Sequence, residues 1–155
     1  MNKKSKEEFY LDIAKTVSQR STCMNIKTGC VIVNREFDTI VSIGYNSAPI
    51  GCDDCEDNGE CNVLKYNDSG CCIGTSSIAN ALIFMPSYEK YCDIFIYSEN
   101  MHTNKEIYFK PTFEQIKMLL NGSIFRVHIS HPEANYISFT TDELYYDAIN
   151  DMVVA

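Results

Sequence analysis

Basic residues and long hydrophobic runs are both scarce in this sequence of 155 residues. Only 13 Lys and Arg are present against 21 Asp and Glu, which gives a formal net charge of −8 at pH 7. The single basic cluster, Lys3, Lys4 and Lys6, is followed at once by Glu7 and Glu8. Because so acidic a chain repels the phosphate backbone of nucleic acids, nucleic-acid binding is disfavoured as the main function.

The hydrophobic segments are too short for a membrane-spanning protein. The longest apolar runs reach about six residues, whereas a bilayer crossing needs roughly 20. The opening sequence, MNKKSKEEFYLDIAK, is charged and lacks the apolar stretch of a signal peptide. We therefore expect no membrane association and a cytoplasmic location. The abundance of Asn, Ile, Lys and Tyr is typical of an AT-rich genome such as that of a phage or virus, and the location would then be the host cytoplasm.

Length and composition predict one globular domain over residues 1–155. Hydrophobic residues make up 45% and charged residues 22%, which is ordinary for a folded protein. A chain of this length can bury roughly 70% of its extended surface and needs no disulfide bonds to fold. No internal repeat or linker divides it.

Hydrophobic periodicity predicts alternating helices and strands. Helices are expected over 7–20, 76–85 and 111–120, and a last helix is expected after Thr141. We expect Ser76 or Ser77 to cap the second helix and Thr141 to cap the last one. Strands are expected over 30–34, 39–46, 92–98 and 123–130, with a possible closing strand at MVVA. Residues 47–75 lack periodicity and are expected to form a long loop. This order predicts an α/β fold, a three-layer α/β/α sandwich around a mixed five-stranded sheet.

Eight cysteines are the unusual part of the composition. Five of them fall in the predicted loop, at Cys52, Cys55, Cys61, Cys71 and Cys72. In a reducing compartment, clustered cysteines more often bind a metal than form disulfides. The remaining three, Cys23, Cys30 and Cys92, are interpreted as small core residues.

The cysteine-rich loop is predicted to hold a structural zinc ion. Zinc prefers four tetrahedral thiolate or imidazole ligands, and a C-x2-C pair followed by further cysteines supplies them. About 25 loop residues need an ordering force, and a structural zinc provides on the order of 10 kcal/mol. Cys55, Cys61 and one of Cys71 and Cys72 are the preferred ligands, with Cys52 as a possible fourth. The alternative is a set of free thiols on a flexible loop.

Residues 21–51 resemble the opening of the deoxycytidylate (dCMP) deaminases. That family has S-T-C, a short basic stretch, G-A-V-I-V, a turn, and a strand that ends in G-Y-N-G-x-P-x-G. The positions in register are Ser21, Thr22, Cys23, Gly29, Val31, Ile32, Val33, Gly44, Tyr45, Asn46, Pro49 and Gly51. A cysteine-bearing insertion and a helix containing Asn80, Ala81 and Leu82 follow as in the family. The resemblance covers about residues 9–98 and implies a cytidine deaminase-like fold, with the second, structural zinc that related deaminases often carry in this insertion.

The catalytic signatures of that family are not found at the expected places. The resemblance implies H-A-E on the second helix and P-C-x-x-C at the start of the third, where His and two Cys hold a zinc ion and Glu moves a proton. The expected His and Glu fall on Ser76 and Ile78, and the second signature falls within 102–106, at degenerate positions that include Thr103 and Glu106. No cysteine follows Cys92.

These substitutions predict a chain that has no catalytic zinc and is not an enzyme, a pseudoenzyme that acts by binding. A metal rebuilt on His102, Glu106 and Ser76 is a less favoured interpretation than a polar surface turn. The expected partner is a protein or a second copy of the chain, with a role in nucleotide metabolism. Two alternatives remain open: a sensor that binds a pyrimidine nucleotide, and an active zinc-dependent dCMP deaminase whose metal site is displaced toward the loop cysteines.

Asn46 is the candidate for a residual nucleotide pocket. In the family this Asn lines the substrate pocket near the sugar, whereas the competing interpretation makes it a turn residue at a strand end. The usual basic residue after S-T-C is Asn25 here, which weakens phosphate recognition.

Overall fold

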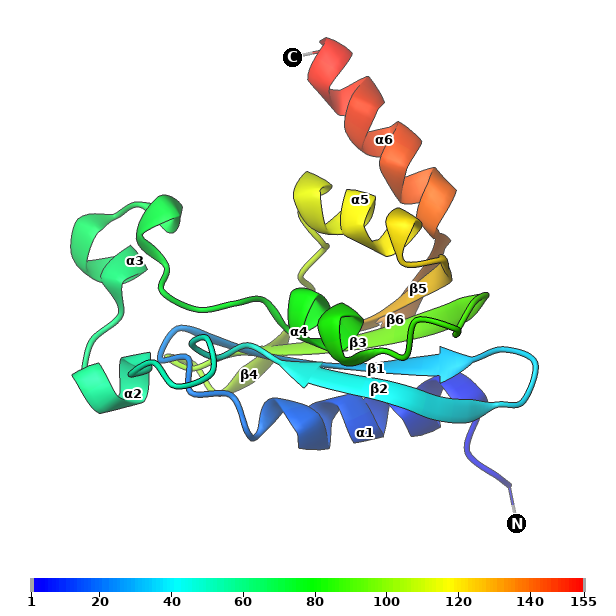
Figure 1. Cartoon of the computed structure of the whole chain (residues 1–155), viewed down its shortest axis with the longest axis horizontal. Helices are drawn as coiled ribbons and strands as arrows, with labels where there is room; N and C mark the ends of the chain where they lie inside the picture. Colours follow the sequence, from blue (N-terminus) through cyan, green and yellow to red (C-terminus); the bar gives the residue numbers. More distant parts are fainter. Residues whose placement is uncertain (1, 155) are drawn as a thin grey trace.

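The computed structural model describes residues 2–154 and places one sheet between two layers of helices (Figure 1). Helix α1 (Lys6–Ser18) covers one face of the sheet. The opposite face carries α4 (Ser77–Phe84), α5 (Phe113–Asn121) and the first turns of α6 (Thr141–Val154). The predicted three-layer α/β/α architecture is confirmed.

The sheet is mixed and has six strands. They are β1 (Ile26–Asn34), β2 (Thr39–Tyr45), β3 (Cys92–Asn100), β4 (Lys105–Ile107), β5 (Ile124–His131) and β6 (Asn135–Thr140). The order is β2-β1-β3-β5-β6, with β4 paired to β3. Only β3 and β5 run parallel, and α5 makes the crossover between them. The short strands β4 and β6 were not predicted from the sequence.

Alternation along the central strands creates two hydrophobic cores. On β1, Val31 and Val33 point to α1, while Ile32 points to the opposite helical layer. The same alternation on β3 puts Phe95 under α1 and Ile94 under α4 and α5. Burial on both faces explains why these strands read as continuous apolar runs.

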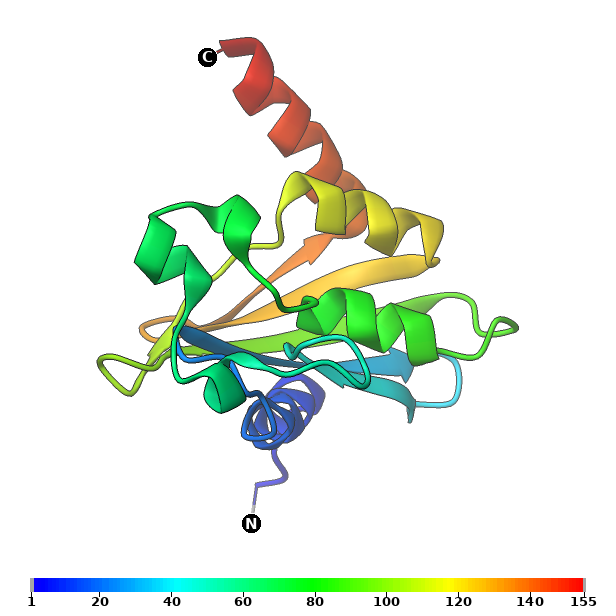
Figure 2. The ribbon, with the colours of Figure 1, turned by 60° about the vertical axis from the view of Figure 1, so that its left-hand side comes forward.

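The cysteine-rich insertion is not a featureless loop. It contains the short helices α2 (Cys55–Asn58) and α3 (Asn62–Tyr66) and a 3-10 turn at Ser69–Cys71. Asp54 caps α2 by accepting a hydrogen bond from the Asp57 amide at 3.0 Å. The insertion stands beside the helical layer, next to the N-terminal ends of α4 and α5 (Figure 2).

The C-terminal predictions are corrected in two respects. The MVVA segment continues α6 as far as Val154 and does not form a strand, and Ala155 lies outside the described residues. The cap of α6 is Thr140, whose hydroxyl accepts from the Glu143 amide at 3.1 Å, while the Glu143 carboxylate accepts from the Thr140 amide at 3.0 Å. Thr141 is instead buried and donates to the Ile124 carbonyl at 2.7 Å.

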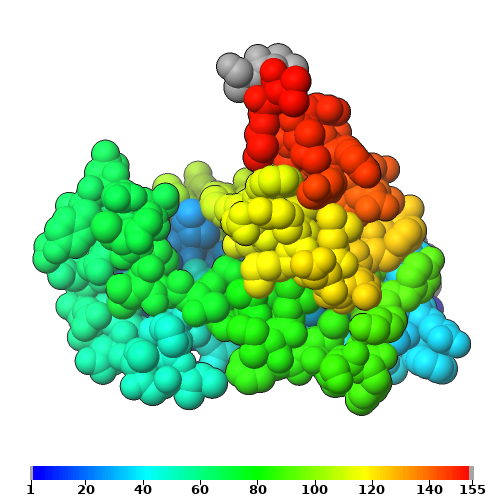
Figure 3. All heavy atoms as spheres, turned by 45° about the horizontal axis from the view of Figure 1, so that its top comes forward, coloured from blue at the N-terminus to red at the C-terminus, as the bar shows by residue number. Residues whose placement is uncertain are grey.

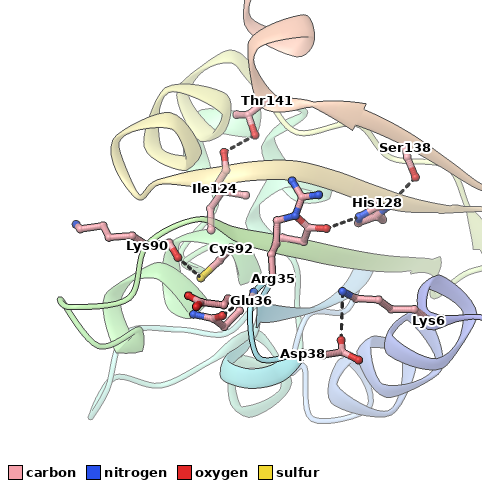
Figure 4. Close-up of polar contacts among 12 residues, drawn as sticks. Lys6, Arg35, Glu36, Asp38, Lys90, Cys92, Ile124, His128, Ser138 and Thr141 are labelled. Atoms are coloured by element: carbon pink, nitrogen blue, oxygen red, sulfur yellow. Dashed lines mark hydrogen bonds and ion pairs between the residues drawn. The ribbon is translucent and has the colours of Figure 1, made fainter.

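A buried polar network lies on the α1 face of the sheet, beside the end of β1 (Figure 4). Asp93 Oδ2 lies 3.0 Å from His128 Nε2, and His128 Nδ1 lies 2.6 Å from Ser138 Oγ. Arg35 Nε is 3.4 Å from the second Asp93 oxygen. The His128 ring stacks on Phe95 with the ring centroids 4.4 Å apart. The network therefore joins the end of β1 to β3, β5 and β6.

Gly44 allows β2 to approach α4 closely. A Cβ at this position would lie 2.3 Å from the Ser77 carbonyl oxygen and 2.5 Å from the Ala81 amide nitrogen, so backbone atoms would have to move. We expect Gly44→Ala to lower the free energy of unfolding by about 1–3 kcal/mol, the usual cost of overpacking, as measured by urea denaturation. Gly74→Ala is the control because its nearest atoms would be at 3.6 Å, and equal losses in the two variants would contradict this contact.

Candidate functional site

A pocket of about 350 Å³ opens between the insertion and the helical layer. Its walls come from residues 22–28 before and within β1, the turn after β2, the insertion, and the N-terminal ends of α4 and α5. Figure 3 shows the hollow between the insertion and α5, with residues of the N-terminal part visible at its floor. Segments far apart in the sequence thus share one concave site, which is typical of small-molecule binding.

The pocket lining carries uncharged polar groups within a largely apolar surface. Among the residues that line it in the described part of the chain there is no Asp, Glu, His, Lys or Arg. The hydroxyl and amide side chains are Thr22, Asn25, Thr28, Asn46, Ser47, Asn62, Ser69, Thr75, Ser76, Ser77, Thr112 and Gln115. Such a lining can orient a polar ligand by hydrogen bonds, but it supplies no carboxylate for proton transfer.

Asn46 lines the pocket, but its side chain is occupied by the protein itself. Its Oδ1 accepts from the Ser21 hydroxyl at 2.6 Å and from the Thr28 amide at 2.9 Å. Its Nδ2 donates to the Ile26 carbonyl at 2.7 Å. Asn46 therefore fastens the β2 turn to the start of β1 and shapes the pocket wall. Loss of this side chain would disturb both segments.

The two predicted degenerate positions on α4 lie at the pocket. Ser76 caps α4 by accepting from the Ala79 amide at 3.1 Å, and Ile78 lines the pocket as well. Thr103 and Glu106 lie instead in the turn after β3 and in β4, outside the lining. Thr112 and Gln115, which sequence reasoning did not single out, occupy the corresponding wall.

The start of α5 has the spacing of the second signature, which was expected at 102–106. Residues 111–115 read P-T-F-E-Q, so Thr112 and Gln115 stand at the places of the two cysteines in P-C-x-x-C. Thr112 Oγ1 accepts from the Gln115 amide at 3.3 Å, and Gln115 Oε1 accepts from the Thr112 amide at 2.9 Å. This capping box fixes both side chains at the helix N-terminus beside the pocket.

Four cysteines share this pocket: Cys23, Cys55, Cys61 and Cys72. Burial raises the pKa of the Cys55 thiol, and the neighbouring thiols of Cys23, Cys61 and Cys72 raise it further. Cys52 and Cys71 are not part of the lining. Cys23, interpreted from the sequence as a core residue, is therefore a pocket residue, whereas Cys30 and Cys92 are fully buried in the core as expected.

The thiol groups are of a kind that binds zinc, but their positions are not those of ligands around a metal ion. Within residues 2–154 no three His, Cys, Asp or Glu side chains stand in an arrangement ready to hold a metal ion. Thiolates are nevertheless preferred zinc ligands, and four ligands are the usual number for a structural zinc ion.

The raised pKa of Cys55 predicts slow alkylation in metal-free protein. Only the thiolate reacts, so we expect the iodoacetamide rate at Cys55 to be low at neutral pH and to rise as the pH passes above the ordinary thiol range. Mass spectrometry of the modified peptides measures it, with the exposed Cys52 as the internal comparison. Equal rates for the two thiols at neutral pH would contradict this environment.

Comparison with known proteins gives sequence relatives and structural neighbours, although no family model matches the chain. The "Probable deoxycytidylate deaminase" of Caenorhabditis elegans is 51% identical over 49 residues, which cover 32% of this chain and 24% of that protein. The deoxycytidylate deaminase of Mycobacterium phage D29 is 31% identical over 100 residues, which cover 60% of this chain and 71% of that protein. The match thus spans about a quarter of the nematode protein and most of the phage protein.

Solved structures agree on the fold. The apo dCMP deaminase of cyanophage S-TIM5 aligns with a TM-score of 0.60 at 18% identity over 94% of both chains. The same enzyme in complex with dCMP and dUMP aligns with a TM-score of 0.58 at 22% identity over 82% of both chains. The cytidine deaminase-like fold expected from the sequence is therefore confirmed.

These relatives correct one prediction. The sequence was interpreted as a chain that is not an enzyme, yet its relatives from the nematode and the mycobacteriophage are both named as deoxycytidylate deaminases. The prediction rested on two short signatures, whereas the similarity to the phage protein extends over 100 residues. Between residues 2 and 154 no helix combines the length and apolarity that a bilayer crossing needs.

Proposed function

Because the chain belongs to the deoxycytidylate deaminase family, we propose that it binds a pyrimidine deoxynucleotide, dCMP first among them, in the thiol-lined pocket and deaminates it. The observation that carries the proposal is the joint lining of one pocket by four thiols and by the N-terminal ends of α4 and α5. A solved structural neighbour holds dCMP and dUMP, which supports this ligand class. Uncharged amides and hydroxyls are suited to the edge of a pyrimidine base.

We infer that the two family signatures have been replaced and not moved along the chain. Ser76 and Ile78 stand for the His and Glu of the first. Thr112 and Gln115 at the start of α5 stand for the two cysteines of the second, with Pro111 retained. Hydroxyl, amide and alkyl groups do not hold zinc. The ordinary catalytic zinc position therefore does not suit a metal in this chain.

The thiols on the insertion side supply the alternative. The ion would be held by Cys23, Cys55, Cys61 and Cys72. Of the two neighbouring cysteines, this set takes Cys72 and not Cys71. Its fourth ligand is Cys23 in place of Cys52. Four thiolates fill the tetrahedral coordination of zinc, so the ion would order the peptide that supplies its ligands. With one of the four thiolates withdrawn, the ion would bind water at the open position and lower the pKa of that water. The chain's own part is to orient the nucleotide with Asn25 and Thr28 on one wall and Gln115 on the other.

Phosphate recognition provides a gain-of-function test. The lining holds no cation, and Asn25 is half-buried at the position where the family has a basic residue. We expect Asn25→Arg to tighten dCMP binding by about tenfold, because a guanidinium makes charge-assisted hydrogen bonds to phosphate. Binding of deoxycytidine, which has no phosphate, should change little. Isothermal titration calorimetry measures both.

The matched control is Asn25→Gln, which keeps the amide and adds no charge. Unchanged dCMP affinity in both variants would place the phosphate elsewhere. Absence of binding by any pyrimidine nucleotide to the unmodified protein, with or without zinc, would overturn nucleotide recognition altogether.

A further inference from the structure

Three polar side chains on the α1 face of the sheet form a hydrogen-bonded triad that the nucleotide pocket does not use. Asp93 Oδ2 lies 3.0 Å from His128 Nε2, and His128 Nδ1 lies 2.6 Å from Ser138 Oγ. Figure 4 shows His128 pointing to Ser138 on the neighbouring strand. His128 stacks on Phe95, which belongs to the core under α1, whereas the pocket lies on the side of α4 and α5. The triad and the pocket are therefore on opposite faces of the sheet.

The carboxylate of Asp93 orients the His128 ring. A carboxylate only accepts hydrogen bonds, so the proton of the neutral ring is held at Nε2 and the lone pair of Nδ1 faces the Ser138 hydroxyl. Asp93 and His128 are each 4% exposed, so the surrounding core restricts rotation of the ring. Arg35 Nε lies 3.4 Å from the other Asp93 oxygen and fixes the carboxylate. The ring is thus placed to accept the proton of Ser138.

Ser138 is the member of the triad that solvent reaches. It is half-buried and lies on β6, which ends the strand order and has one long side without a neighbouring strand among residues 2–154. Successive amides of a strand point to alternate sides, so either the Ser138 amide or those of its two neighbours point to this open side. A hydroxyl next to an oriented base, with amide donors close by, is the arrangement that acyl transfer requires.

We propose that Ser138 is a nucleophile that accepts the acyl group of small activated esters, with His128 as its general base and Asp93 as the positioning residue. The Ser138 oxygen bonds to the ester carbonyl carbon while the hydroxyl proton passes to His128 Nδ1. The bond from that carbon to the leaving oxygen then breaks, and the leaving oxygen takes the proton back from His128. The products are an acylated Ser138 and an alcohol.

The test treats the full chain with p-nitrophenyl acetate, stops the reaction with acid and maps the acetyl groups by mass spectrometry of peptides. Acetylation of Ser138 should be about 100-fold or more faster than that of Ser87, because a general base contributes on that order. Ser87 is the internal comparison, since it is exposed in a turn after α4 that contains no histidine. Ser138→Ala should release less p-nitrophenol and should bind zinc and dCMP as the unmodified protein does.

Two variants test the roles of the base and of its positioning residue. His128→Gln should slow Ser138 acetylation by about 100-fold or more and leave Ser87 unchanged. Asp93→Asn should also slow it, because the amide donates to Nε2 and leaves the ring proton at Nδ1. Nitrogen NMR of the His128 ring should show this move of the proton, which a merely structural role of Asp93 would not produce. Circular dichroism checks that both variants fold.

The comparison of Ser138 with Ser87 in the unmodified protein is decisive even where a variant does not fold. Equal acetylation of the two serines would overturn the proposal. Undiminished Ser138 acetylation in folded His128→Gln would do the same. So would the absence of acetylated Ser138 together with p-nitrophenol release that Ser138→Ala leaves unchanged.

Discussion

Protein purified without added metal or chelator is expected to contain about one zinc ion per chain, and Cys61→Ser is expected to lose it. Cys61 is the buried thiol of the four that line the pocket, and it precedes α3. Replacing one thiolate of a four-thiolate site removes a quarter of the donors and leaves a much weaker site. Elemental analysis of each variant gives the answer directly.

Cys71→Ser is the matched control for this change. Cys71 is adjacent to Cys72 in the sequence but does not line the pocket, so its variant should keep zinc. Cys23→Ser and Cys52→Ser separate the two candidate fourth ligands, and only the former should lose the ion. Retention of zinc by Cys23→Ser together with its loss from Cys52→Ser would refute the pocket assignment.

Removal of the ion should also destabilise the insertion. Zinc binding to structural sites supplies on the order of 10 kcal/mol, and the insertion has little core of its own, because Cys61 is the only buried residue in 51–75 of the described chain. We expect chelation to lower the melting temperature and to expose residues 51–75 to proteolysis before the sheet. A melting temperature that changes with neither chelator nor added zinc would contradict this role.

Asp93→Ala is expected to lower the free energy of unfolding by about 3 kcal/mol or more. The Asp93 carboxylate is buried between His128 and Arg35. Its removal leaves His128 Nε2 without its hydrogen-bond partner and Arg35 without its ion-pair partner. The Arg35 guanidinium lies over Tyr91 and Phe125, with ring centroids 4.8 and 4.4 Å away, which fixes its position beside Asp93. Urea denaturation measures the loss.

Ser138→Ala is the comparison within the same network. It removes one half-buried hydroxyl from His128 and should cost about 1 kcal/mol, the net value of an ordinary hydrogen bond. If Asp93→Ala costs no more than Ser138→Ala, the Asp93 contacts contribute little and the network is not a main link between the strands.

The central strands and flanking helices could be predicted because each carries its own periodicity. Val31, Ile32 and Val33 on β1 alternate between two cores, and no distant information is needed to recognise a strand buried on both faces. Strand β6 has no fully buried residue, so its weak alternation did not identify it. Val153 and Val154 are β-branched, as is typical of strands, but α6 points away from the sheet at this end (Figure 1).

The site depends on contacts that sequence spacing does not reveal. Cys23 joins Cys55, Cys61 and Cys72 only because the insertion folds back over the start of β1. The second signature was expected at 102–106, directly after β3. The hairpin that contains β4 lies between β3 and α5, so the helix begins later in the sequence. The wall of the pocket is therefore built nine residues later, from 111 onward. A Pro that opens a predicted helix was the local signal that marks this place.

The most direct test of the central claim is conversion of dCMP to dUMP by zinc-loaded full-length protein, followed by separation of the two nucleotides. We predict dUMP formation that requires zinc, disappears in Cys61→Ser and persists in Cys71→Ser. Zinc-loaded protein that binds dCMP but forms no dUMP would contradict deamination while leaving nucleotide recognition in place. Conversion that is equal in the two cysteine variants would contradict the thiol-held metal.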